Sequence, residues 1–302
     1  MKAATTEKIV SAHLETSHLK FGTILLATDF SANAKLALRI AARFGKNYDS
    51  KLVLFHSVLP VIAAPELPSA SEALKAETDA AKREMKKLAE ILTDDLIRYQ
   101  MVVHCGRAVE GICAVAASHK ADLIVMGSHG ASGLEKLALG SVAEAVLRHS
   151  HVPVLVVGPR CNLASNVERY TSVLLATDLN LGCLRATQYA ASIAEENNAK
   201  LTLVHVEREI SNLSAAARKD LEKKLCSFLP NDAALWCRPK VRLEFGDPST
   251  QIVSAALAEE ADLVVVGTHD TGALSDHAPW SVISKLIRGL LCPVLAVASH
   301  AS

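Results

Sequence analysis

The sequence predicts an α/β protein built from two repeated domains, each a doubly wound sheet of five parallel strands in the order 3-2-1-4-5. Short segments that are apolar throughout alternate with segments of helical periodicity, and strands of that kind need helices on both faces of the sheet. The whole alternation occurs a second time, because residues 24–58 recur as residues 173–207. Right-handed crossovers between successive parallel strands favour the doubly wound order.

The elements of the first copy can be assigned in order. We expect strands at the apolar runs ILLA, LVLFHSV, MVVHC, LIVMG and VLVVG, which begin at residues 24, 52, 101, 123 and 154. Helices are expected at residues 33–44, 72–97, 108–118 and 141–149. The second of these helices should pack on the sheet through one apolar face, formed by Ala81, Met85, Leu88, Leu92 and Leu96.

The repeat defines the domain organisation. Thr28 matches Thr177 at an offset of 149, whereas the run ADLIVMG from Ala121 matches ADLVVVG from Ala261 at an offset of 140. The second copy is therefore nine residues shorter, and the first copy carries an extra proline-bearing segment at 59–69 that we interpret as a flap. A period this long indicates duplicated domains rather than a solenoid. We expect domains at 1–158 and 171–302, joined by a linker at 159–170.

Composition narrows the class of protein. The 302 residues contain 32 Lys plus Arg and 32 Asp plus Glu, so no general field attracts nucleic acid or an anionic membrane. The N-terminal residues lack the apolar core of a signal peptide, and no stretch approaches the roughly 18 apolar residues of a membrane span. Seven cysteines without a CxxC pair indicate reduced thiols. We expect a cytoplasmic protein.

A glycine-bearing loop follows the fourth strand of the first copy. The segment GSHGASGLEKLALGS contains Gly127, Gly130, Gly140 and Ser141 in the pattern G-x-x-G, nine residues, G-S, and a helix follows. Glycines let backbone N–H groups approach a ligand, and a helix N-terminus carries positive partial charge. In the predicted order this loop meets the end of the first strand, Thr28 and Asp29, at the switch point of the sheet, where such folds bind ligands. The pattern predicts an anion site for the phosphates of a nucleotide.

These residues resemble the universal stress protein family in its tandem form, and the resemblance extends from Phe21 to Ala298. It implies an adenine-nucleotide alpha-hydrolase-like fold and ATP in the first domain, held with Mg²⁺ or Mn²⁺. It also implies that Asp29, next to Thr28, lies beside the adenosine and that Val58 meets adenine through its backbone. The residues implied to line the ribose and phosphates are Gly127, Gly130, Gly140, Ser141 and Val142.

The second copy departs from this signature. Asp270 stands at the position of Gly130 and Trp280 at that of Gly140, while Gly267 and Ser281 are retained. A carboxylate repels phosphate, and an indole fills space that a bare backbone leaves open. We therefore expect one ATP per chain, with the second domain as a structural or regulatory partner.

Other residues have simpler interpretations. Asp29 is also a good helix N-cap, and His56 and His205 suit hydrogen bonds at strand ends better than catalysis. His129 has a counterpart, His269, in the degenerate copy, which argues against a phosphate-specific role. His149 and His151 lack a third metal ligand, so we nominate no metal site.

The loop also lacks the G-K-[ST] of a P-loop, and no base is placed to activate water, so we nominate no catalytic residue. The leading hypothesis is a nucleotide-responsive regulator of a stress response, read by another protein. A slow ATPase and a nucleotide-independent interaction scaffold remain as alternatives. The last strands, Val154–Val157 and Val294–Val297, should be sheet edges, which favours an internal pseudo-dimer of the two domains and leaves a homodimer of whole chains open.

Overall fold

The computed structural model describes residues 19–59, 70–94, 96–130, 139–162, 169–207, 214–230, 233, 239–268 and 279–299. These residues form two compact units. The first unit spans Lys20–Pro159, and the second contains the described residues from Arg160 onward together with Leu19, whose N–H donates to Ser192 Oγ at 3.1 Å. Residues 60–69 of the predicted flap and residues 163–168 of the predicted linker lie outside the described part. Within the described part, no helix is both long and apolar enough to cross a bilayer.

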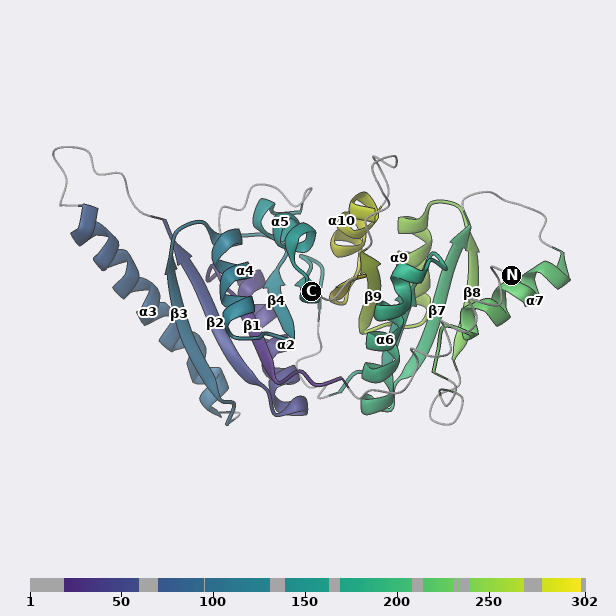
Figure 1. Ribbon diagram of the computed structural model, residues 1–302, viewed down its shortest axis with the longest axis horizontal. Coiled ribbons are helices and arrows are strands. Elements are labelled where there is room, and N and C mark those ends of the chain that lie inside the picture. Colours follow the sequence, from purple (N-terminus) through teal and green to yellow (C-terminus); the bar gives the residue numbers. More distant parts are fainter. Residues whose placement is uncertain are drawn as a thin grey trace. The chain divides into compact units, whose positions relative to one another are not determined.

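The first unit alternates strands and helices as the sequence predicts (Figure 1). Its described elements are β1 (Thr23–Ala27), α2 (Ala32–Tyr48), β2 (Lys51–Val58), α3 (Ala70–Asp94), β3 (Tyr99–Cys105), α4 (Ala108–Ser118), β4 (Leu123–Gly127), α5 (Ser141–His149) and β5 (Val154–Val157). Every strand pairs with its neighbours in parallel, in the order β3-β2-β1-β4-β5. The predicted order is confirmed.

The second unit repeats this topology. Its described elements are β6 (Ser172–Ala176), η1 (Leu181–Cys183), α6 (Leu184–Asn197), β7 (Lys200–Glu207), α7 (Ala215–Cys226), β8 (Lys240–Phe245), α9 (Pro248–Ala258), β9 (Leu263–Thr268), α10 (Pro279–Gly289) and β10 (Val294–Ala298). Its strands follow the order β8-β7-β6-β9-β10, which is the order of the first unit in corresponding elements.

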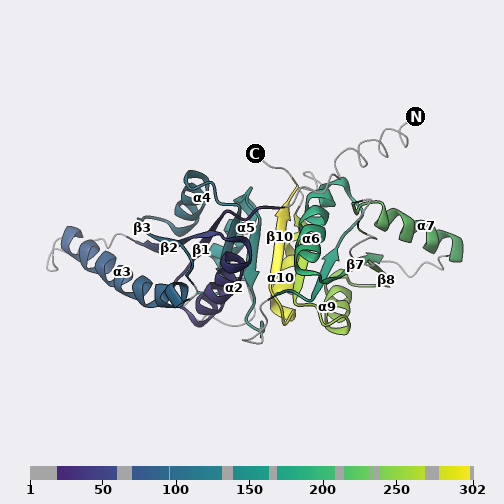
Figure 2. The ribbon, with the colours of Figure 1, turned by 90° about the horizontal axis from the view of Figure 1, so that it is seen from below.

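Helices cover both faces of each sheet. In the first unit α2 and α3 lie on one face and α4 and α5 on the other, as Figure 2 shows. The central strands are consequently apolar throughout: Leu25, Leu54 and Val125 are fully buried. The recurring Ala-Asp-Leu sequence also has a structural role, because the Asp122 carboxylate accepts the N–H of Thr23 (2.9 Å) and Asp262 accepts that of Thr171 (2.7 Å). Each aspartate thus anchors the first strand of its unit.

Several helices end in a left-handed residue that is not glycine. After α4, Lys120 has φ +51°, its N–H donates to Ala117 O (3.1 Å), and the N–H of Ala121 donates to Ala116 O (2.8 Å), which is a Schellman motif. The corresponding left-handed residues after α3, α6 and α9 are Leu96, Asn198 and Glu260. The predicted extension of the second helix to residue 97 is therefore wrong, since α3 ends at Asp94. Leu96 is 91% exposed and does not belong to the buried face of that helix.

Replacing Lys120 by glycine should stabilise the first unit. The backbone there is left-handed and the side chain is exposed, so Lys120→Gly should raise the free energy of unfolding by roughly 0.5–1 kcal/mol, because glycine removes the steric cost of positive φ. Urea denaturation measures the change. Lys120→Ala, which keeps a Cβ, is the matched control and should be close to neutral; an equal gain from alanine would contradict the backbone explanation. Glu260→Gly should reproduce the effect in the second unit.

Candidate functional site

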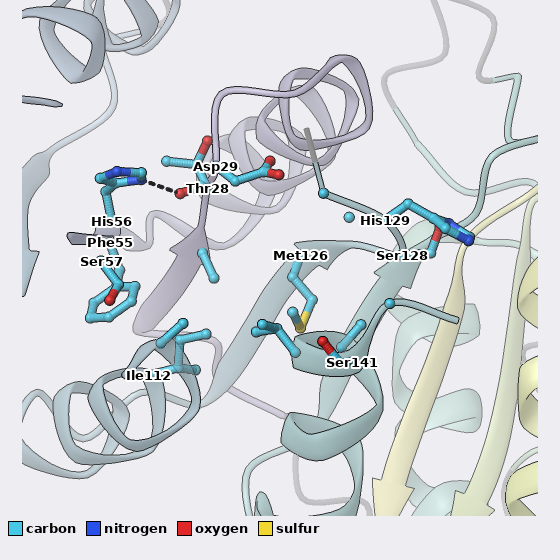
Figure 3. A pocket seen from close by; sticks show the side chains of 17 residues that line it. Thr28, Asp29, Phe55, His56, Ser57, Ile112, Met126, Ser128, His129 and Ser141 are labelled. Carbon is cyan, nitrogen blue, oxygen red and sulfur yellow. Dashed lines mark hydrogen bonds between the residues drawn. The ribbon is translucent and has the colours of Figure 1, made fainter. Parts of the chain in front are cut away.

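A cavity of about 240 Å³ opens in the first unit where β1, β2 and β4 end and α4 and α5 begin. Figure 3 shows the Thr28 and Asp29 side chains on one side of it and Ser141 on the other, with Met126 between them. It is lined by Ala27, Thr28, Asp29, Phe55, His56, Ser57, Ala108, Ile112, Met126, Gly127, Ser128, His129, Gly130, Gly140, Ser141, Val142 and Ala143. Seven of the eight residues nominated from the sequence are in this set.

The eighth nominated residue, Val58, lies apart. It is the last residue of β2, is 6% exposed, and does not line the cavity. Its carbonyl accepts the N–H of Gly106 at 2.9 Å, so part of its backbone is already engaged by the chain itself. The role of Val58 toward adenine stays a prediction.

A tight turn after β1 positions Asp29. Thr28 Oγ1 accepts the N–H of Phe30 (3.1 Å), and Asp29 Oδ1 accepts the N–H of Ser31 (3.1 Å). The N-cap of α2 is Ser31, whose hydroxyl accepts the N–H of Ala34 (3.2 Å), so the helix does not need Asp29 as its cap. The other carboxylate oxygen of Asp29 faces Gly130, where an added Cβ would lie 2.8 Å from it. A side chain at position 130 would therefore collide with this carboxylate oxygen, and glycine avoids the collision.

Gly140 closes the opposite wall. Its N–H donates to Ser128 O at 2.8 Å, and an added Cβ would lie 2.9 Å from the same oxygen. Gly140 is the N-cap of α5 and offers no side chain to the first turn. The N–H groups of Ser141, Val142 and Ala143 have no acceptor within the helix, as in the first turn of any α-helix, and these residues line the cavity. The site therefore presents unpaired donors and the positive end of a helix to whatever enters it.

Gly127 has a different, structural role. An added Cβ would lie 3.1 Å from Asn33 Cβ and 3.2 Å from Ala34 N, because α2 begins directly over the end of β4. In the second unit Gly267 stands equally close to the chain before α6, with Cys183 Sγ 3.1 Å from its added Cβ. The glycine that both copies retain is thus a packing glycine that also lines the cavity in the first unit, whereas the added Cβ of Gly130 or Gly140 would meet Asp29 or Ser128 at the cavity.

The two units share the turn after their first strands. In the second unit Thr177 Oγ1 accepts the N–H of Leu179 (3.1 Å), and Asp178 Oδ1 accepts that of Asn180 (3.0 Å). His205 Nδ1 donates to Thr177 O at 2.8 Å, as His56 Nδ1 does to Thr28 O at 2.8 Å. The hydrogen-bonding interpretation of these histidines is confirmed, and the shared contacts are part of the scaffold rather than specific to a ligand.

What differs is how the second unit satisfies its polar groups. Cys183 Sγ donates to Asp178 Oδ1 at 3.1 Å, and His205 Nε2 lies 3.2 Å from Glu207 Oε1. Burial, reinforced by the Asp178 carboxylate, raises the pKa of the Cys183 thiol to about 12, so it stays a protonated donor. The first unit has Ala34 and Val58 at the positions of Cys183 and Glu207. Ala34 and Val58 cannot make the two contacts that Cys183 and Glu207 make in the second copy.

The start of the last helix differs as well. α10 begins at Pro279 and includes Trp280, whereas α5 begins at Ser141, one residue after Gly140. Trp280, which corresponds to Gly140, therefore lies in the first turn of α10, whereas Gly140 is the N-cap that precedes α5. Asp270 and His269 lie outside the described residues.

Two further histidines, His129 and His149, each have one ring nitrogen beside a nearby polar atom. His129 Nδ1 lies 2.8 Å from Ser128 Oγ, and its side chain points away from the cavity in Figure 3. His149 Nδ1 donates to Ala145 O (2.7 Å) within the last turn of α5. The apolar floor of the cavity, formed by Phe55, Ile112 and Met126, is not among the residues predicted from the sequence. Two of these residues directly precede His56 and Gly127, so inspecting the neighbours of the nominated positions could have found them.

Comparison with known proteins agrees with the repeat. The model of the universal stress protein family matches residues 20–158 and again residues 169–298. A universal stress protein of Mycolicibacterium smegmatis is 26% identical over 286 residues, which cover 91% of this chain and 96% of the relative. One of Methanocaldococcus jannaschii is 36% identical over 144 residues, or 44% of this chain and 80% of the relative. The crystal structure of a universal stress protein from Archaeoglobus fulgidus shares the fold, with a TM-score of 0.72 and 22% identity over 93% of this chain and 100% of that one.

Substituting the packing glycine should affect stability. Gly127→Ala places a methyl group 3.2 Å from the backbone N of Ala34, which cannot move without shifting α2, so the free energy of unfolding should fall by roughly 1–3 kcal/mol. Thermal melting measures it. The matched control is Gly22→Ala in the same unit, where the nearest atom to the new Cβ is Asp122 Oδ2 at 3.5 Å, an ordinary contact. Equal destabilisation by both variants would show that the close approach to α2 is not the cause.

Proposed function

This chain belongs to the universal stress protein family, and we propose that it binds one ATP per chain, in the cavity of its first domain, as the signal of a nucleotide-responsive regulator. One observation carries the proposal. The cavity brings Asp29, the Gly127–Gly130 segment and the first turn of α5 together, so that a carboxylate, a bare backbone and unpaired N–H donors face one space. A nucleotide can use all three, because its ribose hydroxyls donate to a carboxylate and its phosphates accept from N–H donors beside a bare backbone.

Each part of ATP has a matching part of the cavity. The N–H groups of Ser141 and Val142 suit phosphate oxygens. The Asp29 carboxylate is an acceptor for ribose hydroxyls, and the apolar floor of Phe55, Ile112 and Met126 suits the face of a purine. Among the described lining residues none is Lys or Arg, so a divalent cation, Mg²⁺ or Mn²⁺, would supply the positive charge that the phosphates require.

The second domain is proposed to be nucleotide-free. Its Asp178 and His205 already have partners in Cys183 and Glu207. Trp280 replaces the glycine whose bare backbone closes the cavity in the first domain. This domain would act as a structural or regulatory partner of the nucleotide-binding one.

Regulation would follow from a population shift. Phosphate contacts at Gly130 and at the first turn of α5 would favour one conformation of the domain over others, and a partner protein would bind that conformation. Slow hydrolysis is a separate question, decided by single-turnover kinetics with labelled ATP and magnesium. Turnover clearly above that of a Gly140→Trp variant would make the protein an ATPase as well.

Calorimetric titration with ATP and magnesium should report one site per chain. Gly140→Trp should abolish binding, because any Cβ at this position meets the Ser128 carbonyl at 2.9 Å and the indole adds bulk to the wall. Gly130→Asp should weaken binding by placing a second carboxylate beside Asp29 and the phosphates, and salt should relieve the loss only in part. Two equivalent sites in the unmodified chain would contradict the proposal.

A control separates loss of the site from loss of the fold. Gly22→Trp adds the same indole before β1, at the end of the strands opposite to the cavity, where an added Cβ has only an ordinary contact. It should bind ATP with unchanged stoichiometry. A folded Gly140→Trp variant that still binds ATP normally would overturn the assignment of the cavity.

A further inference from the structure

Ser57, near the end of β2, is a polar residue on the apolar side of the cavity. It lines the cavity together with Phe55 and Ile112, and Figure 3 shows it on the other side of this space from Ser141. Its side chain is half-buried, whereas Phe55 is 1% exposed. A hydroxyl at this place is therefore a polar group among residues that suit an apolar surface of a ligand.

The hydroxyl of Ser57 has a fixed polarity. It donates to Gly106 O at 2.5 Å, and because a carbonyl oxygen can only accept, the single hydroxyl proton is committed to this bond. The lone pairs of Ser57 Oγ stay available, and no side chain or backbone N–H of the described residues donates to them. Ser57 therefore offers the cavity a hydrogen-bond acceptor and no donor.

The internal repeat shows that the fold does not need this hydroxyl. Val206 occupies the position of Ser57 in the second unit, and it has no group that could donate to the turn after the third strand. That turn keeps its unusual conformation nevertheless, since Gly246 has φ +118° and Gly106 has φ +146°. The serine thus occurs in the unit with the complete nucleotide signature, and the backbone of the turn does not explain it.

The parts of the cavity proposed for ATP bring the base close to Ser57. With the phosphates at the first turn of α5 and the ribose at Asp29, the base lies toward β2 and α4. Phe55 and Ile112 offer apolar surface to its faces there, and Ser57 Oγ offers an acceptor to its polar edge. Adenine carries on this edge an amino group that donates, whereas guanine carries a carbonyl oxygen that only accepts.

We propose that Ser57 Oγ accepts a hydrogen bond from the exocyclic amino group of adenine and so makes the site prefer adenine to guanine nucleotides. The inference rests on the proposed function and names the side chain that selects the base. A guanine carbonyl at the same place would face an oxygen whose only proton is engaged by Gly106 O. Two acceptors would then meet without a proton between them, and this unpaired contact disfavours guanine.

The test removes one partner of this hydrogen bond at a time. The full chain is titrated, with magnesium, with ATP and with purine riboside 5′-triphosphate, which lacks only the amino group. Ser57→Ala should weaken ATP binding roughly 3- to 10-fold, the loss expected for one hydrogen bond, and should change binding of the purine riboside triphosphate less than about 2-fold. GTP should bind the unmodified chain at least about 10-fold more weakly than ATP, and Ser57→Ala should narrow this difference.

Ser150→Ala is the matched control. Ser150 Oγ also donates to a backbone carbonyl, Val152 O at 2.7 Å, but it precedes β5 at the end of the strands opposite to the cavity, so ATP affinity should not change. Unchanged ATP affinity in Ser57→Ala would overturn the inference, and so would equal losses for both ligands, since Ser57 would then act through the fold. An unmodified chain that binds both ligands equally would overturn it without any variant. An unmodified chain that binds neither would overturn the proposed function itself.

Discussion

The close approach between the end of β4 and the beginning of α2 is the constraint on which the rest of the site depends. Because α2 starts directly over Gly127, the turn that carries Thr28 and Asp29 is held against the turn that leaves β4. The Asp29 carboxylate then faces Gly130, and the chain that returns to α5 is fixed by the bond from Gly140 N–H to Ser128 O. A side chain at Gly127 would separate these turns before any ligand contact could form.

The duplication of the chain separates scaffold from site. Left-handed residues recur at equivalent places, Phe30 with Leu179 and Gly106 with Gly246, so the two units share even their unusual backbone conformations. Contacts present in both units, such as the histidine to the threonine carbonyl, serve the fold. Contacts present in one unit alone mark where the two units differ. By this criterion Gly127 belongs to the scaffold, although it is the first residue of the nucleotide signature.

The sequence predicted the strand order and seven of the cavity residues because both depend on patterns that it displays directly. Apolar runs define buried strands, and the repeat fixes which elements correspond. The sequence could not show that Leu96 lies outside the buried face of α3, since a left-handed helix end without glycine has no sequence signal. Nor could it decide between Asp29 and Ser31 as the cap of α2, because both residue types cap well and only the turn geometry distinguishes them.

The second unit keeps the fold of the first while the side chains at the ends of its strands differ. A carboxylate and an imidazole at the end of parallel strands need partners, and a ligand is one source of them. In the second domain Cys183 and Glu207 are such partners. The residues at the corresponding positions of the first domain are Ala34 and Val58. At the start of α9, Asp247 accepts hydrogen bonds from Ser249 and Thr250 that lower the pKa of its carboxyl to about 2, so this N-cap is charged and the helix is well capped. The two units thus build the same turn after their first strand with different side chains around it.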